Sequence, residues 1–110
     1  MYGPPRGGLL LAEIEGLPAA CVALRPLDAT VCELKRLYVR SGYRGRGLGR
    51  LLAQAAFEAA RRLGYGRIRL DTSPEMQAAQ RLYESLGFHD IAAYYGEAVP
   101  GQRYMEAILS

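Results

Sequence analysis

The clearest chemical signal in this 110-residue sequence is a glycine- and arginine-rich segment, Arg44-Gly45-Arg46-Gly47-Leu48-Gly49. Three glycines at alternate positions let the backbone turn tightly and bring its N–H groups close to a ligand. A helical pattern starts at Leu48, and the first turn of a helix adds unpaired N–H donors and the positive end of a dipole. Four arginines can pair with phosphate oxygens: Arg40, Arg44, Arg46 and Arg50. The segment therefore predicts a loop that binds a pyrophosphate.

Two other phosphate-binding loops do not match this segment. A P-loop requires a lysine followed by serine or threonine after its last glycine, and Arg50 follows Gly49 here. A dinucleotide fingerprint requires Gly-x-Gly-x-x-Gly, with an acidic residue at the end of the next strand. Asp71 lies at such a position, but the glycine spacing differs and too little chain follows for a doubly wound sheet.

Hydrophobic periodicity predicts the elements that position the loop. Alternation and turn residues predict strands over 8–15, 17–24 and 30–39. Apolar residues at helical spacing predict a helix from Leu48 to Leu63, and a short strand follows at 67–71. A second helix is expected over 74–86, with Ser73 as its N-cap, and closing strands over 88–95 and 103–109. The order βββαβαββ predicts an α+β fold with two helices on a mixed, mostly antiparallel sheet, with a parallel step across the first helix.

Three motifs in this order resemble the GNAT superfamily of N-acetyltransferases over roughly residues 9–109. Arg44-x-x-Gly47-x-Gly49, on a strand–loop–helix, resembles the family's acetyl-CoA loop. Residues 33–39 resemble the strand that leads into that loop. Ala79-x-x-Leu82-Tyr83-x-x-x-Gly87-Phe88 resembles the family's second conserved helix and the turn after it.

The resemblance implies a site for acetyl-CoA as co-substrate, without a metal. The backbone N–H groups of the loop would hold the pyrophosphate: Gly45, Arg46, Gly47, Leu48, Gly49 and Arg50. The backbone of Leu37, Tyr38 and Val39 would pair with the pantetheine arm as if it were another strand, because the family's sheet is splayed at that point.

The resemblance also implies two catalytic residues. Tyr83 would donate a proton to the leaving thiolate, and Glu33 would act as general base, directly or through water. An amine with a pKa of about 10.4 is protonated at neutral pH, and removing that proton costs roughly 4–5 kcal/mol. A carboxylate or a chain of waters can accept it, and a backbone N–H near Val39 could stabilise the oxyanion.

Structural interpretations of these residues remain open at this stage. Glu33 could be an ordinary solvent-facing strand residue paired with Lys35 or Arg36. Tyr83 could be a half-buried aromatic residue on its helix. Tyr94 and Tyr95 could line the acceptor pocket or pack on the sheet.

The sequence departs from the family in two places. Family members commonly carry an asparagine seven residues before the helix tyrosine, where this chain has Met76. They also have a further strand and one or two helices before the first hairpin, whereas only a loose lead-in over residues 1–8 is expected here. The chain length predicts a single GNAT-like domain over residues 1–110. Without the preceding elements, a strand edge or an apolar face of this domain would be uncovered and could pair with a second copy. We therefore expect a homodimer.

Composition limits the other functional classes. Half of the residues are hydrophobic and 23% are charged, which is typical of a globular domain. The net charge of +3 is too small to indicate nucleic-acid binding without a basic face. With no signal peptide or long apolar run recognisable, we expect a cytoplasmic protein that does not bind membranes. Cys21 and Cys32 are expected to be free thiols, since neither has metal-ligand or nucleophile spacing.

Two functional hypotheses follow. The first is an N-acetyltransferase that moves the acetyl group of acetyl-CoA directly to an amine of an unidentified acceptor. The alternative is a non-catalytic acyl-CoA-binding module or sensor. A nucleic-acid-binding domain is a weaker third interpretation, because no stripe of basic and aromatic residues supports it.

Overall fold

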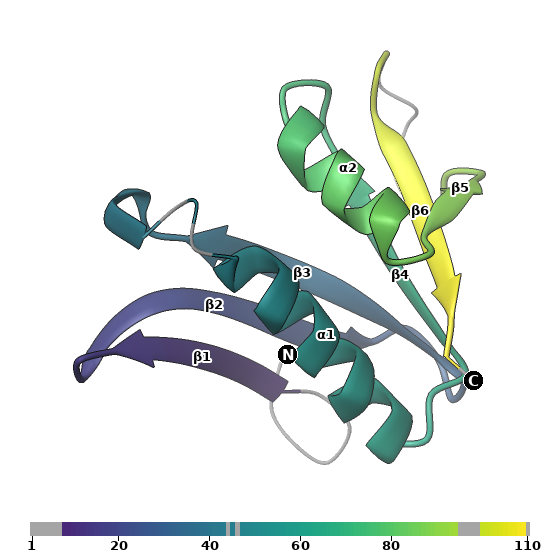
Figure 1. Cartoon of the computed structure of the whole chain (residues 1–110). Helices are drawn as coiled ribbons and strands as arrows, with labels where there is room; N and C mark the ends of the chain where they lie inside the picture. Colours follow the sequence, from purple (N-terminus) through teal and green to yellow (C-terminus); the bar gives the residue numbers. More distant parts are fainter. Residues whose placement is uncertain (1–7, 44, 46, 95–99, 110) are drawn as a thin grey trace.

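A computed structural model describes residues 8–43, 45, 47–94 and 100–109. Its six strands form one sheet in the order β1-β2-β3-β4-β6-β5 (Figure 1). All neighbouring strands are antiparallel except β3 and β4. The elements are β1 (Gly8–Ile14), β2 (Leu17–Pro26), β3 (Val31–Val39), η1 (Ser41–Tyr43), α1 (Leu48–Arg62), β4 (Arg67–Thr72), α2 (Gln77–Ser85), β5 (His89–Ile91) and β6 (Arg103–Ile108). The predicted α+β class, element order and parallel step are confirmed.

Two predicted boundaries are wrong. Helix α2 begins at Gln77, three residues later than predicted, because Pro74 and Glu75 form a turn before it. Ser73 does not cap the helix with its side chain: its hydroxyl donates a hydrogen bond to Glu75 instead, at 2.7 Å. The strand predicted over 88–95 ends at Ile91.

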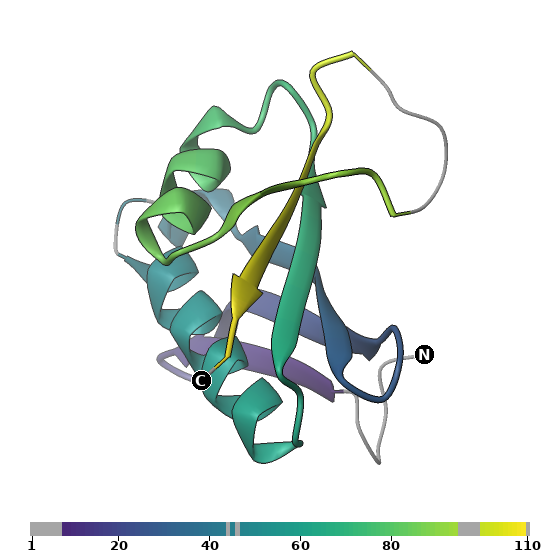
Figure 2. The same ribbon diagram turned by 90° about the vertical axis from the view of Figure 1, so that its right-hand side faces the viewer.

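Both helices pack on the same face of the sheet (Figure 2). Helix α1 presents Leu52 and two alanines, Ala56 and Ala60, to the core, so its backbone lies close to the strands. Phe88 links the two helices, since its ring centroid lies 5.5 Å from those of Phe57 in α1 and Tyr83 in α2. The remaining core side chains come mainly from the central strands: Val22, Leu24, Leu34, Ile68, Leu70 and Met105.

The sheet opens between β3 and β4. Their parallel ladder contains only three pairs, from Val31–Arg67 to Glu33–Arg69, and the two strands then diverge (Figure 1). A register shift between β2 and β3 falls next to this point, between the pairs of Ala23 with Lys35 and Cys21 with Tyr38. An irregularity of this kind increases local twist and redirects side chains. The rest of β3, up to Val39, therefore has β2 as its only strand neighbour.

Candidate active site

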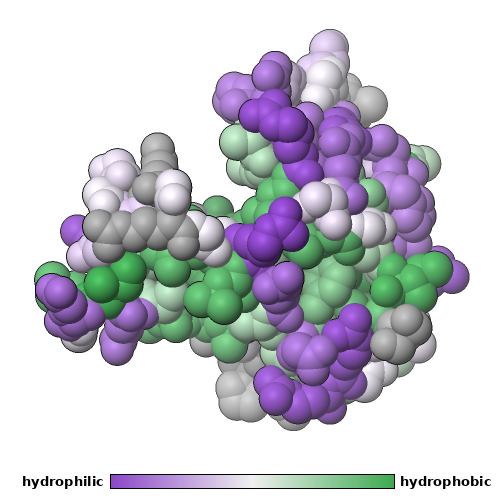
Figure 3. All heavy atoms as spheres, in the orientation of Figure 1, coloured by the Kyte–Doolittle hydropathy of each residue, from purple (hydrophilic) through white to green (hydrophobic). Residues whose placement is uncertain are grey.

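An apolar groove lies between the end of β3, the start of α1 and helix α2. Its volume is about 350 Å³, and its lining residues are Leu37, Val39, Gly49, Ala78, Ala79 and Leu82. Figure 3 shows the surface hollowed between the end of β3 and α2, with hydrophobic residues around the hollow. None of these six residues has a polar or charged side chain, so the polar contacts that they offer a ligand come from their backbone.

The amino end of α1 supplies such backbone donors. Gly47 is the N-cap residue in the left-handed conformation (φ 75°), and no side chain caps the helix. The first turn contains no acidic residue. The intrahelical ladder begins with the Leu51 N–H, which donates to the Gly47 carbonyl at 3.1 Å. The N–H groups of Leu48, Gly49 and Arg50 therefore lack intrahelical acceptors and suit an anion.

The other residues of the predicted pyrophosphate loop are only partly described. Gly45 is left-handed (φ 82°), as a tight turn requires. Arg44 and Arg46 lie outside the described residues. The Arg50 guanidinium donates a hydrogen bond to the Ser85 hydroxyl in α2 at 2.7 Å, and Arg40 donates one to the Pro18 carbonyl at 3.2 Å. Both described arginine side chains thus have protein partners.

A second cavity, of about 220 Å³, lies where β3 and β4 diverge. Its lining residues are Leu34, Lys35, Leu37, Leu70, Asp71, Met76 and Tyr83. Leu37 belongs to the walls of both hollows, so the groove and this cavity lie next to each other. Met76, which replaces the family's asparagine, is the N-cap residue of α2.

Among the described residues that line the cavity, Tyr83 alone carries a phenol. Burial, and then the nearby Asp71 carboxylate, raise the pKa of Tyr83 to about 12. The side chain therefore stays protonated at neutral pH and can act as a proton donor. The interpretation of Tyr83 as a half-buried residue is wrong, since only 3% of it is exposed.

Two charged residues in the cavity wall were not singled out from the sequence as site residues. The Lys35 ammonium lies 3.4 Å from an Asp71 carboxylate oxygen and 3.7 Å from Glu33. Gln102, between β5 and β6, donates a hydrogen bond to the other Asp71 oxygen at 2.8 Å. The alternation of residues 33 and 35 in β3, and of 69 and 71 in β4, could have indicated a shared polar face.

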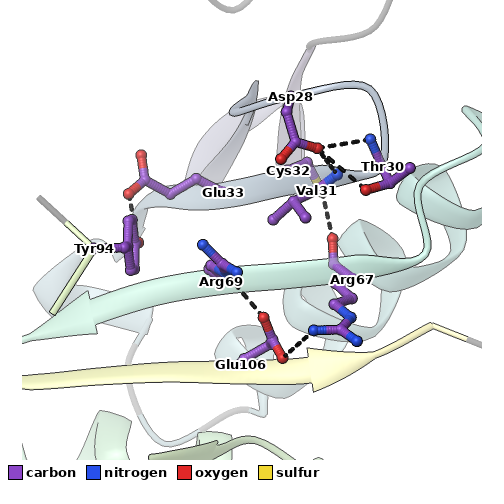
Figure 4. Close-up of polar contacts among 9 residues, drawn as sticks. All are labelled: Asp28, Thr30, Val31, Cys32, Glu33, Arg67, Arg69, Tyr94 and Glu106. Carbon is purple, nitrogen blue, oxygen red and sulfur yellow. Dashed lines mark hydrogen bonds and ion pairs between the residues drawn. The ribbon is translucent and has the colours of Figure 1, made fainter. Parts of the chain in front are cut away.

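Glu33 lies on the sheet face opposite the helices and outside the cavity wall. It is fully buried, and its Oε2 accepts a hydrogen bond from the Tyr94 hydroxyl at 2.6 Å (Figure 4). Its Oε1 lies 3.3 Å from the Arg25 guanidinium but accepts no hydrogen bond. The prediction of a pair with Lys35 is confirmed, but the solvent-facing interpretation is wrong.

The three predicted β3 residues divide between the two faces of the sheet. Leu37 and Val39 line the groove with their side chains. The Tyr38 side chain is 53% exposed and contributes to a separate apolar pocket with Leu11 and Cys21. Only the backbone of Tyr38 is therefore available to a ligand in the groove.

The remaining chemistry-bearing residues do not gather into a site. Cys21 and Cys32 form no disulfide, as expected; Cys32 is buried, whereas Cys21 is partly exposed rather than buried. Within the described ranges, no cluster of three or more His, Cys, Asp or Glu side chains could hold a metal ion. No helix in this part of the chain has the length and apolar character needed to cross a membrane.

Comparison with known proteins explains this arrangement. Residues 1–88 match the acetyltransferase (GNAT) family. The chain belongs to this family. An uncharacterized N-acetyltransferase of Schizosaccharomyces pombe is 41% identical over 99% of this chain and 68% of its own length. The uncharacterized N-acetyltransferase YjgM of Escherichia coli is 35% identical over 83% of this chain and 56% of its own length. The chain therefore spans 56% to 68% of the length of these two GNAT relatives.

Solved GNAT structures share the fold. A putative acyl-CoA N-acyltransferase from Klebsiella pneumoniae superposes with a TM-score of 0.88 and 27% identity, over 96% of this chain and 74% of its own. A GNAT acetyltransferase from Elizabethkingia anophelis with acetyl-CoA bound has a TM-score of 0.81 and 20% identity, over 94% and 77% of the two chains. Acetyl transfer to an amine is the general reaction of this family.

Proposed function

We propose that this chain binds acetyl-CoA in the groove and transfers its acetyl group directly to an amine. The observation that carries the proposal is the shared wall at Leu37: an apolar groove beside the amino end of α1 lies next to the cavity that Tyr83 lines. This arrangement suits a ligand with an anionic end and a thin, amide-containing arm that leads to a reactive carbonyl.

The backbone supplies the contacts to acetyl-CoA. The pyrophosphate lies against the N–H groups of residues 45–50, where the helix dipole favours negative charge. The pantetheine arm pairs with the backbone of residues 37–39, beyond the point where the β3–β4 ladder ends. The arginines of the loop, Arg44 among them, add charge pairing with phosphate oxygens.

Chemistry takes place in the cavity by direct attack. The amine nitrogen forms a bond to the acetyl carbonyl carbon, and the carbon–sulfur bond breaks. Tyr83 gives its phenolic proton to the departing thiolate, and a proton from the amine replaces it. The second proton lost by the substrate ammonium goes to a base. Backbone N–H groups near Val39 stabilise the oxyanion of the tetrahedral intermediate.

We propose that Glu33 is the base and that it receives the proton indirectly, without contacting the substrate amine. Its Oε1 is buried and accepts no hydrogen bond, so this oxygen can accept a proton or a hydrogen bond from a bound water. The same oxygen lies 3.7 Å from the Lys35 ammonium, which contributes to the cavity wall. The proton path from an amine in the cavity thus passes Lys35 and water before it reaches Glu33.

Calorimetric titration with acetyl-CoA, combined with a matched pair of variants, tests the binding half of this proposal. A Cβ at Gly49 would contact a Leu82 methyl at 3.5 Å, an ordinary van der Waals distance. Gly49→Ala should therefore keep affinity within a few fold. Gly49→Leu fills the groove and should lower affinity about a hundredfold or more, roughly 2.7 kcal/mol. If folded Gly49→Leu bound acetyl-CoA as tightly as the wild type, acetyl-CoA would not bind in this groove.

A non-catalytic acyl-CoA-binding module is the second candidate. The burial of Glu33 beneath Tyr94 favours the non-catalytic module, because the Tyr94 side chain covers the proposed base on the sheet face opposite the helices. Release of free CoA across a panel of small amines, amino acids and amino-terminal peptides separates the two candidates. Tight binding without release would establish the module.

The homodimer stays a prediction. Strand β1 is at the edge of the sheet, and Leu11 and Leu17 are exposed near it. Sedimentation at two concentrations tests the expected self-association.

A further inference from the structure

Lys35 is the only lysine in the sequence, and it lies in the wall of the cavity that contains Tyr83. Every other strongly basic residue of the chain is an arginine. An arginine guanidinium is a poor acyl acceptor, because it stays protonated and its lone pairs are delocalised. The chain thus has a single side-chain amine, and this amine is located beside the proposed acid.

Two carboxylates hold the Lys35 ammonium at this position. Asp71 lies 3.4 Å away from the β4 side, and Glu33 lies 3.7 Å away on β3. Three quarters of the Lys35 side chain is shielded from solvent, since its exposed fraction is 26%. The ion pairs fix the nitrogen at one wall of a small cavity and place two proton acceptors next to it.

We propose that Lys35 is a self-acetylation site: the chain transfers the acetyl group of its own bound acetyl-CoA to the Lys35 Nζ when no other amine occupies the cavity. This inference rests on the proposed function. Holding the two reactants in one cavity makes the step intramolecular, which raises its rate far above that of reaction from solution.

The step balances without a further reactant. Asp71 takes one proton from the ammonium, and the freed amine attacks the thioester carbonyl. A carbon–nitrogen bond forms and the carbon–sulfur bond breaks, while Tyr83 protonates the thiolate. The nitrogen's second proton restores the Tyr83 phenol, and Asp71 passes its proton to solvent. The products are acetyl-lysine, free CoA and one proton.

Acetylation changes the electrostatics of the site. It removes the positive charge of Lys35 and therefore both of its ion pairs. Arg25, at 3.3 Å, remains as a cationic partner of Glu33. The bulky amide also stays in the cavity, where an acceptor amine would otherwise bind. The modified chain should accordingly transfer acetyl groups to external amines at least tenfold more slowly.

The test is to incubate the purified chain with acetyl-CoA alone and to follow its intact mass, with peptide mapping of the product. We expect one acetyl group per chain at Lys35, at a rate per chain that does not change with chain concentration. Lys35→Arg keeps the charge but lacks the nucleophile, and it should stay unmodified. At an acetyl-CoA concentration near the wild-type Kd, Gly49→Leu should react at least tenfold more slowly, because it should bind acetyl-CoA about a hundredfold more weakly.

Each other outcome overturns the inference. Acetyl found only on the α-amino group of Met1 would exclude Lys35. An equal rate in Gly49→Leu would indicate chemical acetylation from solution, and a rate that rises with chain concentration would indicate transfer between copies. If acetyl-CoA binds and amines release CoA but Lys35 stays unmodified, this inference alone fails. Absence of acetyl-CoA binding by calorimetry removes the proposed function as well.

Discussion

The two faces of the splayed sheet are built in different ways. On the helix face, the groove is lined by aliphatic side chains and a glycine, and its polar contacts are backbone groups of β3 and α1. On the opposite face, charged side chains from separate strands contact each other: Glu33 and Lys35 in β3, Arg69 and Asp71 in β4 and Glu106 in β6. Figure 4 shows Glu33, Arg69 and Glu106 of this set.

This difference favours separate roles for the two faces: the helix face would bind the co-substrate, and the opposite face would select the acceptor and handle its protons. A groove made of backbone recognises a ligand that is common to a whole family, since backbone groups are present in every sequence. A surface made of side chains can change with each substitution, so it suits the selection of an acceptor and the handling of its protons. Variants on the two faces should therefore separate binding of acetyl-CoA from turnover.

The largest expected effect is that of Tyr83→Phe, at the boundary between the two faces. Loss of the proton donor should lower kcat about a thousandfold and leave acetyl-CoA affinity within a few fold. Because burial and Asp71 raise the pKa of Tyr83 to about 12, the phenol stays protonated up to about pH 10. The wild-type kcat should thus show no decline from this group below that pH. A decline near pH 9 that disappears in Tyr83→Phe would contradict the assignment.

Glu33→Gln should lower kcat about a hundredfold, because the amide cannot accept the proton. Tyr94→Phe is the matched control, since it removes the 2.6 Å hydrogen bond but keeps the carboxylate. We expect Tyr94→Phe to retain most of the activity. If Glu33→Gln also lowered acetyl-CoA affinity, measured by calorimetry, binding and turnover would not be assigned to separate faces of the sheet.

Two glycine substitutions test how tightly the turn before β6, which contains Gly101, packs against Pro74 in the turn before α2. Gly16 and Gly101 have similar left-handed conformations, with φ of 80° and 81°. A Cβ at Gly101 would overlap the Pro74 ring, whereas one at Gly16 would meet nothing within 4 Å. Gly16→Ala should cost about 1 kcal/mol of unfolding free energy, and Gly101→Ala about 2 kcal/mol more. Equal urea midpoints for the two variants would show that the Pro74 contact relaxes freely.

The smallest effect is expected at Arg50. Arg50→Ala and Ser85→Ala both remove one exposed hydrogen bond between the helices, so each should cost below about 1 kcal/mol in urea unfolding. Only Arg50→Ala also removes a guanidinium beside the proposed pyrophosphate site. It should weaken acetyl-CoA binding several fold, while Ser85→Ala should leave affinity unchanged. Equal affinities would exclude a phosphate contact of this side chain.

The same contrast explains which features could be predicted from the sequence. The glycine loop, β3 and the helix that carries Tyr83 are local features, and their order identified the fold and the family. The Lys35–Asp71 and Tyr94–Glu33 contacts join residues that are 36 and 61 positions apart. No local pattern encodes such pairs. The start of α2 was placed too early because the Pro74 turn resembles a helix start until its hydrogen bonds are known.

Because the β3–β4 ladder is short, the proposed co-substrate would complete the sheet beyond the point where these two strands diverge. Among the described residues, only three residue pairs join the two halves of the sheet directly by strand pairing. In the proposed complex, the acetyl-CoA arm along residues 37–39 extends β3 on its open side. A ligand that binds only the folded chain stabilises it by about 2.7 kcal/mol at a hundred times its dissociation constant. If acetyl-CoA binds as proposed, the amide protons at this edge should exchange with solvent more slowly in the complex than in the purified chain alone.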